Sequence, residues 1–149
     1  MRIRRYRPAD GRSLIALVRA LARYEKLAPP GPAAAKRLLR DVGRRIEVLL
    51  AEADGQAIGY AIYLFTYSSF LARPTLYLED VFVLPEHRGA GVGRAFFDAL
   101  LKEARREGCG RMEWVVLRWN TPAIRFYDRT GAKPLKEWLT YRLEVARSR

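Results

Sequence analysis

A glycine-rich segment between a predicted strand and a predicted helix constrains the fold of this chain more than any other feature. Residues 75–84 form an apolar and aromatic run, and a helical pattern of apolar residues begins at Val92 and ends at Gly108. Residues 111–117 then form another apolar run. A strand, a helix and a strand in this order imply a right-handed crossover between parallel strands.

Hydrophobic periodicity predicts the other elements. Apolar residues spaced three and four apart from Leu14 are typical of an amphipathic helix, with Asp10 or Ser13 as its N-cap. No repeat, long linker or low-complexity segment interrupts the sequence, so we expect one mixed α/β domain over residues 1–149. The remaining predicted elements are a helix ending near Tyr24, a short helix before Gly43, strands at residues 46–53 and 57–67 joined by the hairpin signal Asp54-Gly55, a helix from its cap Thr121 to Gly131, and a strand at residues 138–145.

The cysteine and histidine content excludes several kinds of site. The chain has one cysteine, Cys109, and one histidine, His87, so it has no intramolecular disulfide and no Cys/His zinc cluster. No G-x-S-x-G motif offers a nucleophilic serine. The sequence has neither a signal peptide nor an apolar run of the roughly 18 residues that span a membrane. We therefore expect a cytoplasmic protein with no metal and no membrane partner.

The net charge of +12, from 28 Lys and Arg against 16 Asp and Glu, raises the alternative of a nucleic-acid-binding domain. The charge is uneven along the chain. Residues 1–50 carry 13 basic and 4 acidic residues, residues 51–100 carry 3 and 6, and residues 101–149 carry 12 and 6. No helix-turn-helix, RNP aromatic motif or long basic run accompanies this charge. Nucleic-acid binding therefore stays as the disfavoured alternative.

The glycine-rich loop is the motif with the most definite chemistry. Gly89, Gly91 and Gly93 let the backbone turn sharply and approach a ligand, and the free amides at a helix start attract an anion. The spacing matches neither the Walker A motif nor the G-x-G-x-x-G dinucleotide fingerprint. From these residues alone, a phosphate cradle and a plain flexible connector both remain open.

Two longer segments carry a resemblance to a known family. The chain resembles motif A of the Gcn5-related N-acetyltransferases (GNAT) in the run LEDVFVLPEHRGAGVGRAFF, residues 78–97, and their motif B segment in WNTPAIRFYDRTGAKPL, residues 119–135. Within that family it is similar to the spermidine/spermine (diamine) N-acetyltransferase group, which RALARYEK, GYAIYLFTYSSF and YLEDVFV also resemble. The similarity spans residues 2–143.

The resemblance implies a fold and a reaction. The fold would be of the GNAT type, a mixed and mostly antiparallel sheet with one splayed parallel strand pair, flanked by about four helices. Acetyl-CoA would be the acetyl donor, and the protein would be a homodimer. A primary amine of a small molecule, such as a diamine, polyamine or lysine-like compound, would attack the thioester directly in a ternary complex. Acetylation of a protein or peptide amine is the alternative.

The resemblance also implies roles for individual residues. Glu79 matches the acidic residue that removes the proton of the amine, directly or through water, and Tyr127 matches the general acid for the leaving thiolate. Tyr24 and Glu25 match contacts to the acceptor, together with Glu79 and Asp80. The residues implied to contact the cofactor are Val81, Phe82, Val83, Arg88, Gly89, Ala90, Gly91, Val92, Gly93, Arg94, Asn120, Thr121, Pro122, Ala123 and Tyr127.

One segment departs from the polyamine group. The Asp-Pro-Trp that follows Thr-Tyr in the group is Ser68-Ser69-Phe70 in this chain. The change removes a carboxylate and a large aromatic ring from the acceptor side. The resemblance therefore implies amine acetylation more strongly than it implies polyamine specificity.

Overall fold

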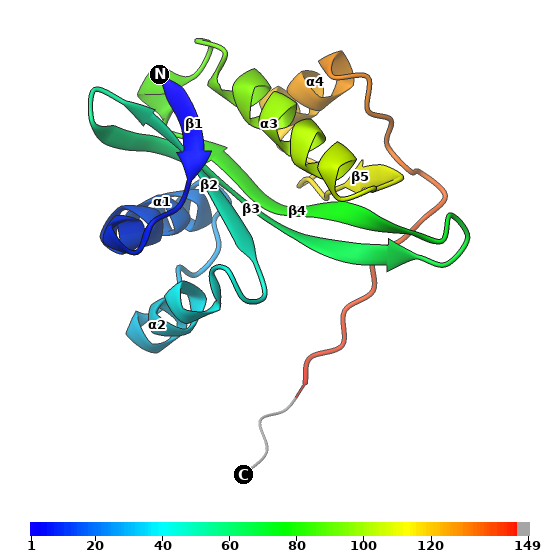
Figure 1. Ribbon diagram of the computed structural model, residues 1–149, viewed down its shortest axis with the longest axis horizontal. Coiled ribbons are helices and arrows are strands. Elements are labelled where there is room, and N and C mark those ends of the chain that lie inside the picture. The colour runs from blue at the N-terminus through cyan, green and yellow to red at the C-terminus, as the bar shows by residue number, and fades with distance from the viewer. Residues whose placement is uncertain (146–149) are drawn as a thin grey trace. The chain divides into compact units, whose positions relative to one another are not determined.

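The sheet of the protein follows the order of the chain. The computed structural model describes residues 1–145, and residues 1–115 form one compact unit that contains the five strands. Neighbouring strands pair antiparallel from β1 to β4, and β4 pairs with β5 in parallel, as predicted (Figure 1). The strands are β1 (Arg2–Arg5), β2 (Glu47–Ala53), β3 (Gln56–Ser68), β4 (Arg73–Val83) and β5 (Arg111–Glu113).

Residues 1–145 also form four α-helices, which agrees with the predicted fold class. In the first unit, α1 (Gly11–Tyr24) and α2 (Pro32–Asp41) lie on one face of the sheet and α3 (Val92–Arg106) lies on the other (Figure 1). The fourth helix, α4 (Thr121–Arg129), belongs to a second compact unit that begins at Val116. No helix in the described part of the chain combines the length and apolar character needed to cross a bilayer.

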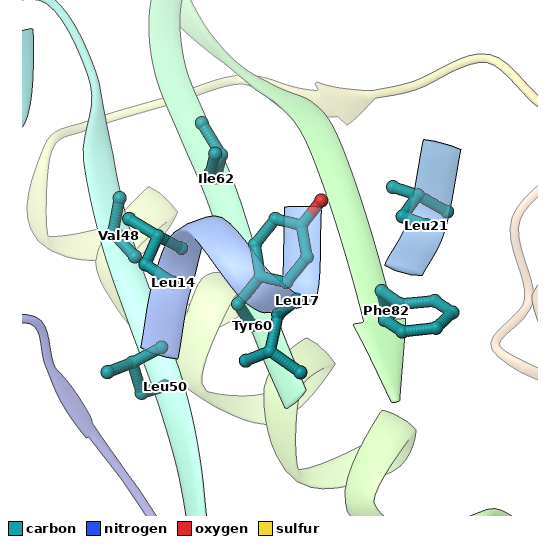
Figure 2. Packing of buried hydrophobic residues seen from close by; sticks show 8 residues of the cluster. All are labelled: Leu14, Leu17, Leu21, Val48, Leu50, Tyr60, Ile62 and Phe82. Atoms are coloured by element: carbon teal, nitrogen blue, oxygen red, sulfur yellow. The ribbon is translucent and has the colours of Figure 1, made fainter. Parts of the chain in front are cut away.

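The core between α1 and the sheet determines where the site residues lie. Leucines of α1 pack on apolar side chains from β2, β3 and β4, and Figure 2 shows the Tyr60 ring in the middle of this cluster. Their burial removes apolar surface from water, which is the main favourable contribution to folding. The cluster consists of Leu14, Leu17, Leu21, Val48, Leu50, Tyr60, Ile62 and Phe82.

The edge strand β1 is an element that the sequence pattern did not predict. Its residues are mostly arginine, so no alternation of apolar and polar residues marks it. Arg4 is nevertheless well buried for a charged residue, with 16% of its side chain exposed. Its guanidinium donates to both carboxylate oxygens of Asp10 at 2.8 Å and to Glu52 on β2 at 2.8 Å. These ion pairs offset the cost of burying the charge.

Replacing Arg4 with methionine should lower the melting temperature at pH 7 by about 3–6 °C. The Arg4 hydrogen bond holds the pKa of Asp10 below its usual range, so this stabilisation is present above the ordinary carboxyl pKa and disappears as the pH falls through the lowered value. The difference from wild type should therefore shrink between about pH 5 and pH 2. Thermal unfolding followed by circular dichroism across this range measures it.

Arg2→Met is the matched control for this prediction. Arg2 also donates to Glu52, at 2.8 Å, but 64% of its side chain is exposed, so solvent screens the pair. A loss of stability as large in Arg2→Met as in Arg4→Met, or a difference from wild type that does not depend on pH, would contradict the role given to Arg4.

Two sequence-based predictions about helix caps are corrected by the structure. The side chain of Asn120, and not that of Thr121, caps α4, because its Oδ1 accepts from the backbone amide of Ala123 at 3.4 Å. Asp10 occupies the N-cap position of α1 but makes no capping bond to that helix. Its carboxylate is instead occupied by Arg4 and by the backbone amide of Arg7.

Two predicted strands near the end of the chain are also corrected. The run at residues 111–117 is a strand only over Arg111–Glu113, and residues 138–145 form no strand. In residues 138–145, apolar residues stand at every second position, as in a strand. Their side chains are 71–92% exposed, so they pack against no other described element. A strand needs a neighbour to accept and donate its backbone hydrogen bonds, and residues 116–145 contain no other strand. The exposed residues are Leu139, Tyr141, Leu143 and Val145.

Candidate active site

A β-bulge in β4 lies at Glu79. In the register of β3 and β4, Ile62 lies opposite Asp80 and Tyr63 lies opposite Leu78, so Glu79 has no residue opposite it. The extra residue shifts the alternation of β4, so the side chains after the bulge lie on the opposite face of the sheet from the one they would occupy in a regular strand. Asp80 consequently shares the α1 face with the core cluster, whereas the side chain of Glu79 is exposed.

Two further carboxylates act on that of Asp80 at this bulge. Asp80 accepts a hydrogen bond from the hydroxyl of Tyr60 at 3.1 Å. Burial raises the pKa of Asp80 to about 6, the Tyr60 bond opposes that shift, and the charges of Glu79 and Glu25 add to it. Burial also raises the pKa of Glu25, which follows the last residue of α1. We call Glu25, Glu79 and Asp80 the acidic cluster.

Arg88 links the predicted acceptor residues to the predicted cofactor strand. Its guanidinium carbon lies 4.9 Å from the ring centre of Tyr24 and 5.3 Å from that of Phe82, distances typical of cation–π contacts. Its Nε donates to the carbonyl of Val83 at 2.9 Å. The rings of Tyr24 and Phe82 are 6.4 Å apart. The structure therefore brings the end of α1, the end of β4 and the start of the glycine loop together.

The parallel strands β4 and β5 separate at the level of the acidic cluster. They pair only from Thr75 opposite Arg111 to Tyr77 opposite Glu113. Beyond this point, residues 78–83 of β4 pair with β3 on one side and with no strand of residues 1–145 on the other. An open edge of this kind leaves backbone groups for a ligand to satisfy. Val81, Phe82 and Val83, the residues implied to contact the cofactor, lie in this part of β4.

The glycine loop ends at the N-terminus of α3 in an anion-binding geometry. Gly89 and Gly91 have φ angles of +78° and +83°, which side chains rarely adopt, and a Cβ at either position would meet nothing within 4 Å. Gly91 is the N-cap, and its carbonyl accepts the first bond of the helix from the Ala95 amide. The amides of residues 92–94 therefore have no acceptor within the helix, and they lie at its positive end.

The second unit contains the other predicted site residues on and beside α4. Asn120 caps the helix and Pro122 lies in its first turn, so both have a structural role in starting it. Ala123 and Tyr127 are four residues apart and share one helix face. Tyr127 is half-buried, with its ring 5.7 Å from that of Phe126 in an edge-on contact.

Two residues that shape the site were not identified from the sequence. Gly59 lies opposite Val83, and a Cβ there would lie 2.7 Å from the carbonyl oxygen of Phe82, so only glycine lets β3 approach β4 this closely. A single glycine inside an apolar strand is a signal that could have revealed it. Tyr60 gave no such signal, because an aromatic residue in an apolar strand is ordinary core.

Comparison with known proteins settles the family. Residues 14–132 match the Acetyltransferase (GNAT) family, and the thialysine N-epsilon-acetyltransferase of Mus musculus is 32% identical over 96% of this chain and 92% of its own length. The chain belongs to the GNAT family. An L-ornithine N5-acetyltransferase of Arabidopsis thaliana is 41% identical to this GNAT chain over 60% of it and 40% of the plant protein. A solved structure titled a probable acetyltransferase has a TM-score of 0.86 at 21% identity, covering 99% of this chain and 100% of that one.

Membership of the GNAT family confirms the resemblance and the prediction that the chain is an acetyltransferase. The solved structure confirms the fold class independently of the sequence. Acetyltransferases of this family take the acetyl group from acetyl-CoA. The open edge of β4 and the amides at the start of α3 fit such a donor, because they offer hydrogen bonds to an extended chain and an anion-binding helix end.

Proposed function

We propose that this GNAT enzyme transfers the acetyl group of acetyl-CoA to a primary amine of a small molecule, by direct attack in a ternary complex. The acidic cluster at the bulge, where β4 leaves β5, is the observation that carries the proposal. Three carboxylates attract an ammonium group, and Arg88 joins Tyr24, the neighbour of Glu25, to the strand proposed to hold the donor. The segment that contains the bulge and the loop, residues 51–100, has more acidic than basic residues despite the net charge of +12.

The proposed contacts to acetyl-CoA follow the resemblance. Backbone groups of Val81, Phe82 and Val83 would bind the pantetheine, and the amides from Gly89 to Arg94, through Ala90 and Val92, would bind the pyrophosphate. From the resemblance alone, we also propose Asn120, Pro122 and Ala123 at the start of α4 as contacts to the cofactor. The bound donor supplies an acyl group activated as a thioester. Because the GNAT match spans residues 14–132 and so includes both units, we propose that they act as one domain.

Two side chains would move protons during the reaction. The amine binds as a cation, since its usual pKa is near 10, and it cannot attack until a proton has left. We assign that proton to Glu79, directly or through a water molecule, because Glu79 is exposed at the bulge. We assign protonation of the departing thiolate to the hydroxyl of Tyr127.

The acceptor is proposed to be a lysine-like amino acid or a diamine. The two relatives described above act, by their names, on the side-chain amines of thialysine and ornithine. Tyr24, Glu25, Glu79 and Asp80 would hold the ammonium and the chain beside it. From the resemblance we also propose a homodimer, and from the sequence pattern a cytoplasmic location.

The proposal is tested by measuring free CoA released from acetyl-CoA across a panel of amines. The panel contains thialysine, lysine, ornithine, a diamine, spermidine, an aminoglycoside and a peptide with a free N-terminus. We expect release above the amine-free rate with the lysine-like compounds or the diamines and polyamines. Release only with the peptide would favour a protein acceptor. No release with any amine, together with salt-sensitive binding to duplex DNA, would favour the nucleic-acid alternative.

A further inference from the structure

Tyr60 is a buried polar group that the proposed chemistry does not use. Its ring lies in the core cluster and is fully buried (Figure 2). It packs beside Phe82, with the ring centres 6.5 Å apart, so the surrounding side chains hold it in one position. A buried hydroxyl needs a hydrogen-bond partner, and the partner here is the carboxylate of Asp80.

The bond gives Asp80 a fixed orientation. The Tyr60 hydroxyl donates to Oδ2 of Asp80 at 3.1 Å, and no other described side chain donates to this carboxylate. A carboxylate accepts through both oxygens, so Oδ1 remains for a cationic ligand. Because Tyr60 is held by the core, Asp80 presents that oxygen from a fixed position at the bulge.

We propose that Tyr60 is a positioning residue for the acceptor site: its buried hydroxyl holds Asp80 in place and keeps it ionised to receive the ammonium of the substrate. This rests on the proposed function, that the enzyme acetylates a small-molecule amine. Tyr60 itself touches neither substrate nor cofactor in this arrangement. It acts through Asp80.

The surrounding charges explain why Asp80 needs this support. Glu79 on β4 and Glu25 at the end of α1 both favour its protonated form, as does burial. The nearby cation Arg88 lies over the rings of Tyr24 and Phe82, and its Nε is bonded to a backbone carbonyl. The Tyr60 bond is the interaction that favours the ionised form, and without it the carboxyl would protonate at a higher pH.

Tyr60→Phe tests the proposal through the pH dependence of kcat/KM for the amine. In wild type, kcat/KM should fall as the pH drops through about 6, the pKa of Asp80. In Tyr60→Phe this fall should move to higher pH by about one unit, because the bond that favours the ionised form is lost. KM for the amine at pH 6 should rise about 5–10-fold, and KM for acetyl-CoA should not change. The amine itself also titrates, so the pH profile of kcat/KM is measured with two amines of different pKa. A fall that occurs at the same pH with both amines belongs to a group of the enzyme.

Tyr63→Phe is the matched control. Tyr63 is on the same strand and is as deeply buried, but it faces α3, where burial and then the charge of Glu103 raise its pKa to about 12. Its ring meets that of Phe65 edge-on at 5.9 Å. Tyr63→Phe should leave the pH profile in place. An equal shift in both variants, or none in Tyr60→Phe, would overturn the proposal.

Asp80→Asn and a direct titration complete the test. In Asp80→Asn the fall near pH 6 should be absent, and adding Tyr60→Phe should have no further effect on the profile. The titration of the Asp80 carboxyl, followed by carbon NMR in the enzyme without substrates, should move to higher pH in Tyr60→Phe and not in Tyr63→Phe. A wild type that releases no CoA with any amine refutes the proposed function, and an unmoved NMR titration refutes the link between Tyr60 and Asp80.

Discussion

Tyr127→Phe is expected to lower kcat by about 10²–10⁴-fold with little change in the affinity for acetyl-CoA. Only the hydroxyl is removed, so the ring keeps its contact with Phe126 and the backbone carbonyl still accepts from the hydroxyl of Thr130 at 2.6 Å. The loss should therefore fall on proton donation to the thiolate and not on the fold of α4. Steady-state rates at saturating amine measure kcat, and calorimetry measures acetyl-CoA binding.

Tyr141→Phe is the control for this prediction. Tyr141 belongs to the same unit, and its side chain is 88% exposed, so losing its hydroxyl should change neither rate nor binding. If Tyr127→Phe retains the wild-type kcat, the general acid is another group, and the assignment that rests on the resemblance fails. A weaker affinity for acetyl-CoA with an unchanged kcat would instead indicate a binding role.

Gly91→Asp is expected to reduce acetyl-CoA binding below detection. The residue is the N-cap of α3 with φ at +83°, where a side chain is strained. The new side chain would enter the open space before the helix and place a negative charge where the pyrophosphate is proposed to lie. A cap carboxylate would also accept the free amides of the first turn, so it would compete directly with the phosphates. Calorimetry with acetyl-CoA measures the loss.

Gly108→Asp is the matched control for Gly91→Asp. Gly108 follows the other end of α3 with φ at +71°, and a Cβ there also meets nothing within 4 Å. The two substitutions impose similar backbone strain and introduce the same charge, so a loss of binding caused by strain alone would appear in both. Normal acetyl-CoA affinity in a folded Gly91→Asp would contradict the cradle, and an equal loss in Gly108→Asp would mean that the effect is not local.

The local structure around the candidate site could be predicted from the sequence where neighbouring residues decide it. The glycine loop and the start of α3 depend on residues only a few positions apart, and the sharp turn before the helix could be predicted from the glycines and the helical pattern that follows. The role proposed for Glu79 came from the resemblance, since nothing in the alternation of β4 marks one residue as the bulge. The bulge exists only in the register with β3.

The sequence by itself determined the elements whose hydrogen bonds are local. The hairpin at Asp54-Gly55, the stripe of leucines on α1 and the glycine loop each follow from the chemistry of adjacent residues. The same reasoning failed for residues 138–145. Apolar and polar residues alternate there as in a strand, but the segment pairs with no strand in the described part of the chain.

Only the tertiary structure decided which groups meet. Arg4 lies between Asp10 and Glu52, Arg88 covers the ring of Tyr24, and Tyr60 bonds to Asp80. Each contact joins different elements, and the Tyr60–Asp80 bond depends on the register of β3 and β4, which Gly59 lets approach closely. Packing in the core, and not local preference, fixes those positions, and they in turn set the charge of the carboxylates proposed to receive the amine.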